Sequence, residues 1–242
     1  SGTNQTPLIG QNAYRYHQGR FEQIGLSWLK HSFCALSESG CGDCQPTDCS
    51  TLGIGCADTY GAGLNTNPGG PRSDANAWSG YYDYPFNVSP SGPSALRGNL
   101  QIKDSDLEPA NFPGARYFFE GYYMSPDDAA AGNHANNASW REFETNGPGN
   151  VWAIGSTNVE IPAIRVWKDI DPSVDMNDVH VPNDGHFIVG AKASDLGNGM
   201  WHYEYAVWNH NSHACAGGFS IFMPPGATVQ NVGFNDVDYH SG

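Results

Sequence analysis

The feature that most constrains the fold is the alternation of apolar and polar residues, with period two, that begins after Leu96. Turn-forming Gly, Pro, Asn and Asp separate the alternating runs, which is typical of short antiparallel strands. The runs predict strands at 99–103, 115–124, 139–145, 151–155, 159–167, 186–193, 200–209, 218–223 and 228–234. Strands of this length and spacing favour a mainly β fold, an antiparallel β-sandwich over residues 96–242.

The run at 200–209 is the most regular, and it continues through a turn at 209–213 into a second run that ends at Met223. This predicts a hairpin. Because side chains alternate between the faces of a strand, one set shares a face and is expected in the core: Trp201, Tyr203, Tyr205 and Val207.

The amino-terminal part of the chain has a different pattern. Residues 1–13 are polar and predict an irregular arm, whereas apolar residues between Arg20 and Leu36 recur at helical spacing and predict one amphipathic helix. The helix and a Cys-rich loop region would fill 14–95, within a single domain of 1–242. A short helical turn is expected after Ser125, because Pro126 suits its first position.

Six cysteines indicate an oxidising environment. An even number of cysteines in a chain with only 11 Lys and Arg favours disulfides that pin the loop-rich segment. Zinc is the alternative, but the single CxxC lacks the second pair that a zinc ribbon needs. The predicted disulfide cysteines are Cys34, Cys41, Cys44, Cys49, Cys56 and Cys215.

The net charge of −14 restricts the partners. A nucleic-acid-binding protein needs a basic face, and the sequence has no cluster of Lys and Arg. No apolar run approaches the length of about 20 residues that a membrane-spanning helix requires, so we expect no membrane insertion. Polysaccharides and cations remain as ligands. The start Ser1-Gly2-Thr3-Asn4 suggests a mature terminus left by signal-peptide removal, and thus a secreted protein.

Several stretches together resemble a family of uncharacterised secreted proteins of environmental bacteria. They are GLSWLKH at 25–31, LGIGCADTY at 52–60, Gly70-Pro71-Arg72, SPDDA at 125–129, WHYEYAV at 201–207 and GFNDVDYHSG at 233–242. The resemblance implies an extracellular or cell-surface location and no particular activity. Members continue beyond the last stretch, which implies a processed or partial chain. Cys49 and Cys215 depart from the family pattern, which implies an extra disulfide between them.

Two groups of side chains are candidate metal sites. Four carboxylates fall in one expected loop and predict calcium, a cation that prefers oxygen ligands: Asp169, Asp171, Asp175 and Asp178. Imidazoles with one carboxylate suggest copper or zinc: His202, Glu204, His210 and His213. Neither group has the spacing of an established motif, so solvated side chains are the alternative for both.

Aromatic residues in the loop-rich segment are candidates for stacking on sugars or on another subunit: Trp78, Tyr81, Tyr82 and Tyr84. They would otherwise cover the open end of the sandwich. Three N-x-S/T sequons begin at Asn4, Asn87 and Asn137 and are glycosylation candidates.

No G-x-S-x-G elbow or other specific catalytic motif occurs in the sequence. The sequence therefore favours an extracellular structural or interaction protein that self-associates, as a subunit of a surface assembly or filament. A secreted metal-dependent enzyme and a carbohydrate-binding module are the alternatives.

Overall fold

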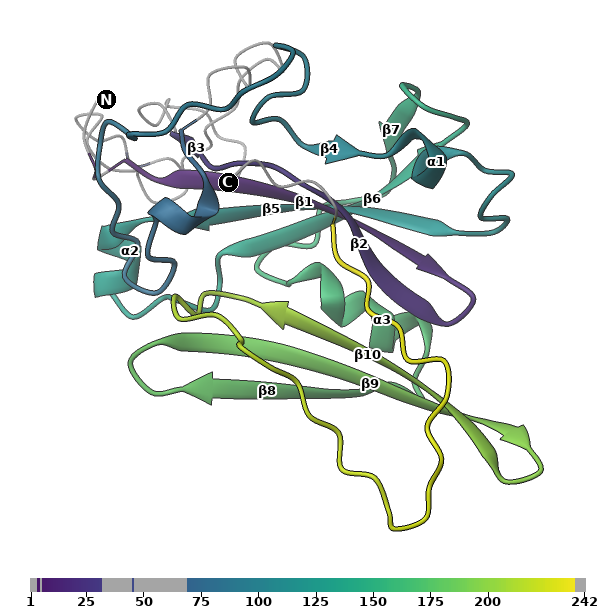
Figure 1. Cartoon of the computed structure of the whole chain (residues 1–242). Coiled ribbons are helices and arrows are strands. Elements are labelled where there is room, and N and C mark those ends of the chain that lie inside the picture. Colours follow the sequence, from purple (N-terminus) through teal and green to yellow (C-terminus); the bar gives the residue numbers. More distant parts are fainter. Residues whose placement is uncertain (1–3, 5, 32–44, 46–68, 238–242) are drawn as a thin grey trace.

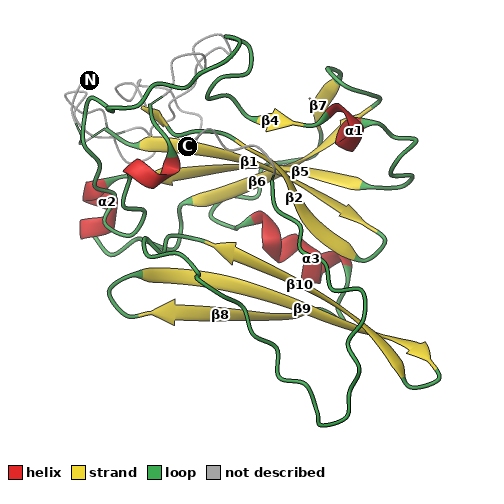
Figure 2. Cartoon of the chain, in the orientation of Figure 1, coloured by secondary structure: helices red, strands yellow, loops and turns green. Residues whose placement is uncertain are grey.

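The computed structural model describes residues 4, 6–31, 45 and 69–237 of the chain. Strands dominate these residues and helices are few and short (Figure 2). The strands form two antiparallel sheets that face each other (Figure 1). The predicted class, mainly β with antiparallel sheets, is confirmed.

The larger sheet has seven strands. Its order is β4-β2-β1-β5-β6-β7, and β3 also pairs with β1. The bounds of these strands are β1 (Leu8–His17), β2 (Arg20–Leu26), β3 (Lys30–His31), β4 (Gln101–Ile102), β5 (Arg116–Met124), β6 (Ala138–Thr145) and β7 (Val151–Ala153).

The hairpin between β1 and β2 explains why the chain reverses so early. Gln18 and Gly19 form its two-residue turn with φ of 51° and 85°. Turns with two positive φ angles match the twist of the flanking strands, and glycine adopts such an angle without steric cost. Beyond this turn Phe21 stacks on Tyr14 at 5.2 Å between ring centroids.

The smaller sheet has three strands in the order β10-β9-β8, with bounds β8 (Asp175–Val181), β9 (Gly185–Gly197) and β10 (Met200–Asn209). The helical elements are η3 (Arg72–Asp74), α1 (Asp104–Leu107), α2 (Pro126–Ala130), η4 (Ala163–Arg165) and α3 (Val166–Ile170). In Figure 1, α3 lies between the two sheets. Its Trp167 is fully buried and donates a hydrogen bond from Nε1 to the carbonyl oxygen of Gly19 over 3.1 Å.

The larger sheet is buried on both faces. Leu8, Tyr14 and Phe118 belong to the core between the sheets. Ala13 and Tyr117 project to the other side, where they form a second cluster with Ile24, Leu107 and Phe143. Covering both faces places the central strands β1 and β5 deep in the molecule.

The amphipathic helix predicted from residue 20 is wrong for the residues that the structure describes. Residues 20–26 form β2, and residues 32–36 lie outside the described residues. The apparent helical spacing arises because β2 is buried on both faces. Phe21 contacts the inter-sheet core, and Ile24, three residues on, lies in the second cluster. A strand buried on both sides shows no clean period of two.

The irregular amino-terminal arm is also wrong where it is described, because residues 8–13 form the first part of β1. Every one of them except Gln11 is buried. Polar Asn12 is tolerated there because its side chain is hydrogen-bonded to Glu120, over 2.7 Å.

Six of the predicted strand regions contain strands: β4, β5, β6, β7, β9 and β10, the last two paired with each other. The predicted strand at 159–167 is wrong, since Pro162 precedes η4 and the chain continues into α3. Residues 218–223 and 228–234 form no strand, so the hairpin ending at Met223 is wrong; β10 pairs with β9 instead. The helical turn after Ser125 is confirmed as α2.

The disulfide prediction rests on residues that the structure mostly leaves undescribed. Cys34, Cys41, Cys44, Cys49 and Cys56 lie outside the described residues, and Cys215 is an exposed, free cysteine. No helix in the described part of the chain is long and apolar enough to cross a membrane.

Candidate functional site

A cavity of about 580 Å³ lies between the two sheets and is lined by polar as well as apolar side chains. Its walls come from β1, β2, β5 and β10, from the segment at 72–77 and from the turn that follows β10. Leu29, Met124 and Trp208 contribute apolar walls. The volume lies in the range of small-molecule sites, about 300–1,000 Å³.

A buried carboxylate beside the cavity organises its polar wall. Glu120 is 1% exposed and accepts hydrogen bonds from Asn12 Nδ2 at 2.7 Å, Tyr14 Oη at 2.8 Å and the Ala163 backbone N–H at 2.7 Å. Burial raises the pKa of Glu120, and these three hydrogen bonds oppose that rise. Burial and the neighbouring Glu120 charge also raise the pKa of Tyr14 well above its usual value.

The same network joins the two sheets. Trp208 on β10 donates from Nε1 to the Tyr14 hydroxyl oxygen at 2.8 Å, and Tyr14 in turn donates to Glu120. A chain of hydrogen bonds therefore runs from the smaller sheet through β1 to β5 and η4. Because all members of this chain are buried, each hydrogen bond satisfies a polar group that would otherwise lack a partner.

Arg72 is the cation on the cavity wall. Its Nε donates to the carbonyl oxygen of Ser27 and its Nη2 to that of Gln11, each at 2.8 Å. Both acceptors are neutral, and among the described residues no carboxylate lies within ion-pair distance of Arg72. Burial lowers the pKa of Arg72, and the charges of the nearby Tyr14 and Glu120 oppose that effect.

Two histidines form a relay from the cavity to the surface. His210 lines the cavity, and its Nδ1 lies 3.1 Å from Nδ1 of His186. His186 Nε2 lies 2.6 Å from Asp178 Oδ1. Since a carboxylate only accepts, a neutral His186 donates from Nε2 and accepts at Nδ1 from His210. His210 Nε2 is then unprotonated, and it is buried without a hydrogen-bond partner.

Both imidazoles are held in the neutral form. Burial and the neighbouring His186 lower the pKa of His210 to about 3. Burial also lowers the pKa of His186, against the opposing effect of Asp178. Asp178 itself pairs with Arg165, which together with His186 lowers the pKa of its carboxyl group. The relay therefore presents a hydrogen-bond acceptor, His210 Nε2, at the cavity end, and it ends at the surface in the Asp178–Arg165 ion pair.

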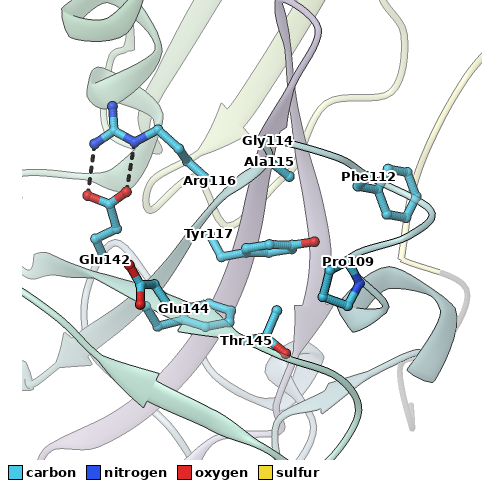
Figure 3. Close-up of a pocket in the computed structure, with 10 residues that line it drawn as sticks. Pro109, Phe112, Gly114, Ala115, Arg116, Tyr117, Glu142, Glu144 and Thr145 are labelled. Atoms are coloured by element: carbon cyan, nitrogen blue, oxygen red, sulfur yellow. Dashed lines mark hydrogen bonds and ion pairs between the residues drawn. The ribbon is translucent and has the colours of Figure 1, made fainter.

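A smaller pocket of about 250 Å³ lies on the opposite face of the larger sheet, between β5, β6 and the loop before β5 (Figure 3). The ring of Tyr117 forms its floor, with Phe112 and Pro109 at one side. The side chains of Arg116 and Glu142 are joined by two hydrogen bonds of 2.7 and 2.8 Å and project from the opposite face of β5 and β6, that of Phe118.

The charges of this small pocket are already paired. Arg116 and Glu142 satisfy each other, and Glu144 accepts a hydrogen bond from Trp152 Nε1 at 3.1 Å. Only the buried Tyr117 hydroxyl lacks a partner. The pocket therefore offers a ligand little polar recognition, and the inter-sheet cavity is the better candidate site.

A third feature is the outer face of the smaller sheet, the side turned away from the larger sheet. The strand register places apolar side chains of all three strands on it: Val179, Val181, Phe187, Val189, Trp201, Tyr203, Tyr205 and Val207. The prediction that Trp201, Tyr203, Tyr205 and Val207 form the core is wrong, because Trp208 and Ala206 face inward instead. We call this surface the outer apolar face.

The four aspartates predicted to bind calcium do not come together. Asp171 pairs with Lys192 at 2.6 Å, and Asp178 pairs with Arg165 and His186. Asp169 lies in α3, and Asp175 begins β8, so the expected acidic loop is in part helix and strand. Within the described ranges, no group of three or more His, Cys, Asp or Glu residues is arranged to hold a metal ion.

The predicted histidine site is divided in the same way. His202 and Glu204 are neighbours on β10, with His202 Nε2 and Glu204 Oε1 2.8 Å apart. His210 instead contacts His186, and His213 is exposed beyond it. Sequence reasoning identified His210 as a site residue but assigned it the wrong partners.

The predicted aromatic cluster does not form one platform. Tyr82 is fully buried and stacks on Phe86, and Trp78 stacks on His134 at 3.8 Å. Tyr81 and Tyr84 are exposed. Of the sequons, Asn87 is exposed, whereas Asn4 and Asn137 are half-buried.

Comparison of the chain with protein-family models, with curated proteins and with solved structures found no match.

Sequence reasoning missed Glu120, Tyr14 and Arg72 as site residues. Glu120 does carry a signal, because it is the only acidic residue in the aromatic run at 117–124. A carboxylate inside an apolar strand is expected to be buried with partners. Those partners come from positions as distant as Asn12 and Ala163, which no local pattern connects.

Proposed function

We propose that this chain is an extracellular structural or interaction protein, a β-sandwich that self-associates through its outer apolar face. The observation that carries the proposal is the exposure of that face: Trp201 is 53%, Tyr203 47% and Val207 44% exposed. The solvent side of an antiparallel sheet ordinarily carries polar residues. Polar residues on the same face, Asp175, Asn177, Asp195 and Asn209, interrupt this surface. An exposed patch with this many large apolar side chains supports an interaction site.

The segment after β10 extends this surface. Residues 216–237 form no helix or strand and cross in front of the smaller sheet in Figure 1, with Phe219 5.3 Å from Tyr205. Phe222 and Phe234 are each 91% exposed. Covering such exposed aromatic residues with a second surface lowers the free energy, because apolar area is removed from water.

A second copy of the chain is the occupant that we propose. β8 and β10 are the edges of the smaller sheet, and edge strands offer unpaired backbone groups for another strand. Phe219, Ile221 and Met223 alternate as in a strand, although this segment pairs with no strand among the described residues. If this segment were added to the edge strand of a neighbouring copy, the backbone groups of the segment and of the edge strand would form hydrogen bonds with each other. Repeated head-to-tail, the contact would build a filament.

We assign this contact to the carboxyl-terminal segment and not to the amino-terminal one, because residues 8–13 are committed to β1 within the same chain. The low fraction of charged residues, 15%, and the clustered cysteines of the sequence support an extracellular setting.

The test is sedimentation velocity over a concentration series, with electron microscopy of the most concentrated samples. We expect the wild type to form oligomers, and Trp201→Ser or Phe222→Ser to weaken association about 30-fold, the effect of losing roughly 2 kcal/mol at an aromatic interface position. Leu96→Ser, at an exposed site outside the outer apolar face, is the matched control. A wild type that stays monomeric throughout the series would show that the proposal is wrong.

A further inference from the structure

The cavity between the sheets holds a cation without an anionic partner. Arg72 uses two of its five N–H groups on backbone carbonyls, and its Nη1 makes no hydrogen bond to any described residue. The nearby Glu120 accepts hydrogen bonds from three other donors and forms none with Arg72, although its charge acts on the guanidinium. A guanidinium in this position is expected to gain from a carboxylate placed in the cavity, because a carboxylate accepts both charge and hydrogen bonds.

A glycine on β1 leaves space for the Arg72 side chain to lie close to the sheet. A side chain at Gly10 would place its Cβ 3.3 Å from Arg72 Nη2, so glycine leaves room for the guanidinium against β1. Arg72 is only partly buried, and it lines the cavity. The guanidinium is therefore fixed in place by Ser27 and Gln11 before any ligand arrives, which reduces the entropy lost on binding.

The other polar end of the cavity is an acceptor. Tyr122 lines the cavity beside His210 and contacts its ring edge-on, with 5.8 Å between the ring centroids. His210 Nε2 is buried without a partner and, in the relay with His186 and Asp178, carries a lone pair and no proton. A hydroxyl group of a ligand is the natural donor to such a nitrogen.

We infer that the inter-sheet cavity binds a small hydroxylated monocarboxylate of the sugar-acid class, with the carboxylate on Arg72 and a hydroxyl group towards His210. A single negative charge matches the single guanidinium. A dianion would add repulsion in a chain of net charge −14. The volume of about 580 Å³ accommodates one such molecule between Leu29, Met124 and Trp208. This site is independent of the outer apolar face.

The experiment is isothermal titration calorimetry with three probes. D-glucuronate carries both groups, D-glucose lacks the carboxylate, and butyrate lacks the hydroxyls. We expect D-glucuronate to bind with a Kd below about 1 mM, and the other two probes to bind at least about 10-fold more weakly. No binding of D-glucuronate at about 10 mM, or equal binding of either partial probe, would overturn the inference.

Variants locate the site. Arg72→Gln is expected to weaken D-glucuronate binding about 10- to 100-fold, as for the loss of hydrogen bonds to a charged group. Arg97→Gln, at an exposed position, is the matched control and is expected to leave binding unchanged. Because Arg72 also holds two backbone carbonyls, Ala77→Trp provides a second route: it fills the cavity from its wall and leaves every polar group in place. Unchanged affinity in Ala77→Trp would place the ligand elsewhere and refute the site.

Discussion

Removal of the Glu120 carboxylate is the sharpest test of the network between the sheets. Glu120→Ala leaves three donors without an acceptor: Asn12 Nδ2, the Tyr14 hydroxyl and the Ala163 N–H. Each buried, unsatisfied donor costs about 1–3 kcal/mol. The variant also removes the desolvation cost of the buried carboxylate, which offsets part of this sum. We therefore expect a net loss of about 3–5 kcal/mol in the free energy of unfolding.

Glu120→Gln separates shape from charge. The amide keeps the volume of the side chain but has only one oxygen, so its NH₂ group must face either the Asn12–Tyr14 pair or the Ala163 N–H. One donor–donor contact follows, at a cost of about 2 kcal/mol. We therefore expect the stability order wild type, Glu120→Gln, Glu120→Ala.

Urea denaturation at pH 7 measures these differences. At a slope of about 3 kcal/mol per M, the midpoint falls by about 1 M or more for Glu120→Ala with the slope unchanged. Glu142→Gln removes a partly exposed carboxylate paired with the exposed Arg116 and should cost less than about 1 kcal/mol. If Glu120→Ala were as mild as this control, the network would not stabilise the fold and the reasoning would be refuted.

The pH dependence gives an independent check. Burial raises the folded-state pKa of Glu120 above its unfolded value, so the folded protein binds more protons between the two values. The contribution of this group to stability is therefore present at low pH and is lost as pH rises from about 4.3 through the raised pKa. Glu120→Gln should lack that loss. An identical pH profile for the two proteins would show that Glu120 does not titrate in this way.

Three further perturbations have defined outcomes. Gly185→Ala places a Cβ 2.4 Å from the Ser212 backbone and should lower the unfolding free energy by about 2 kcal/mol or more, whereas Gly217→Ala, with open space around it, should change it by less than about 1 kcal/mol; thermal unfolding compares the two. Trp208→Phe removes the donor to Tyr14 and should cost about 1–2 kcal/mol in urea denaturation, and no change would mean that this bond is not formed. Because the folded pKa of His210 is lowered to about 3, wild-type stability should fall as pH drops below about 6.5, by up to about 1.4 kcal/mol per pH unit from this group, and His210→Gln should flatten that slope in chemical denaturation between pH 6.5 and 4.

The strands that sequence predicts well are those with one clear pattern and a turn at each end. β5, β6 and β10 match their predicted regions closely, as does α2 after Ser125. Their alternation reflects a real difference between two environments. For β10, however, the pattern gives two faces without saying which is the core. Aromatic residues suggested the Trp201 face, but the opposite face packs through Trp208.

Two of the strands that sequence reasoning missed, β1 and β2, are buried on both faces, whereas the missed β8 is mostly exposed and its aspartates suggested a loop. β1 and β2 have core residues on both sides of the larger sheet, so neither shows the alternation that defines a half-exposed strand. The candidate site was missed for a related reason. Its groups are far apart in sequence, with Tyr14 and Trp208 separated by 194 positions, and only the folded sheets bring them together.

The position of β1 in the larger sheet also sets an order of events during synthesis. β1 pairs with β2 immediately, but its other neighbour, β5, begins only at Arg116. A nascent chain that has not reached β5 holds the β1–β2 hairpin with only the two-residue strands β3 and β4 added to it. A hairpin with so little added to it is marginally stable in water. Pairings between such distant segments are slow to form and leave apolar surface uncovered meanwhile. Completion of β5 is therefore the step on which the larger sheet depends, and a chain that ends before it retains a hairpin without its central partner.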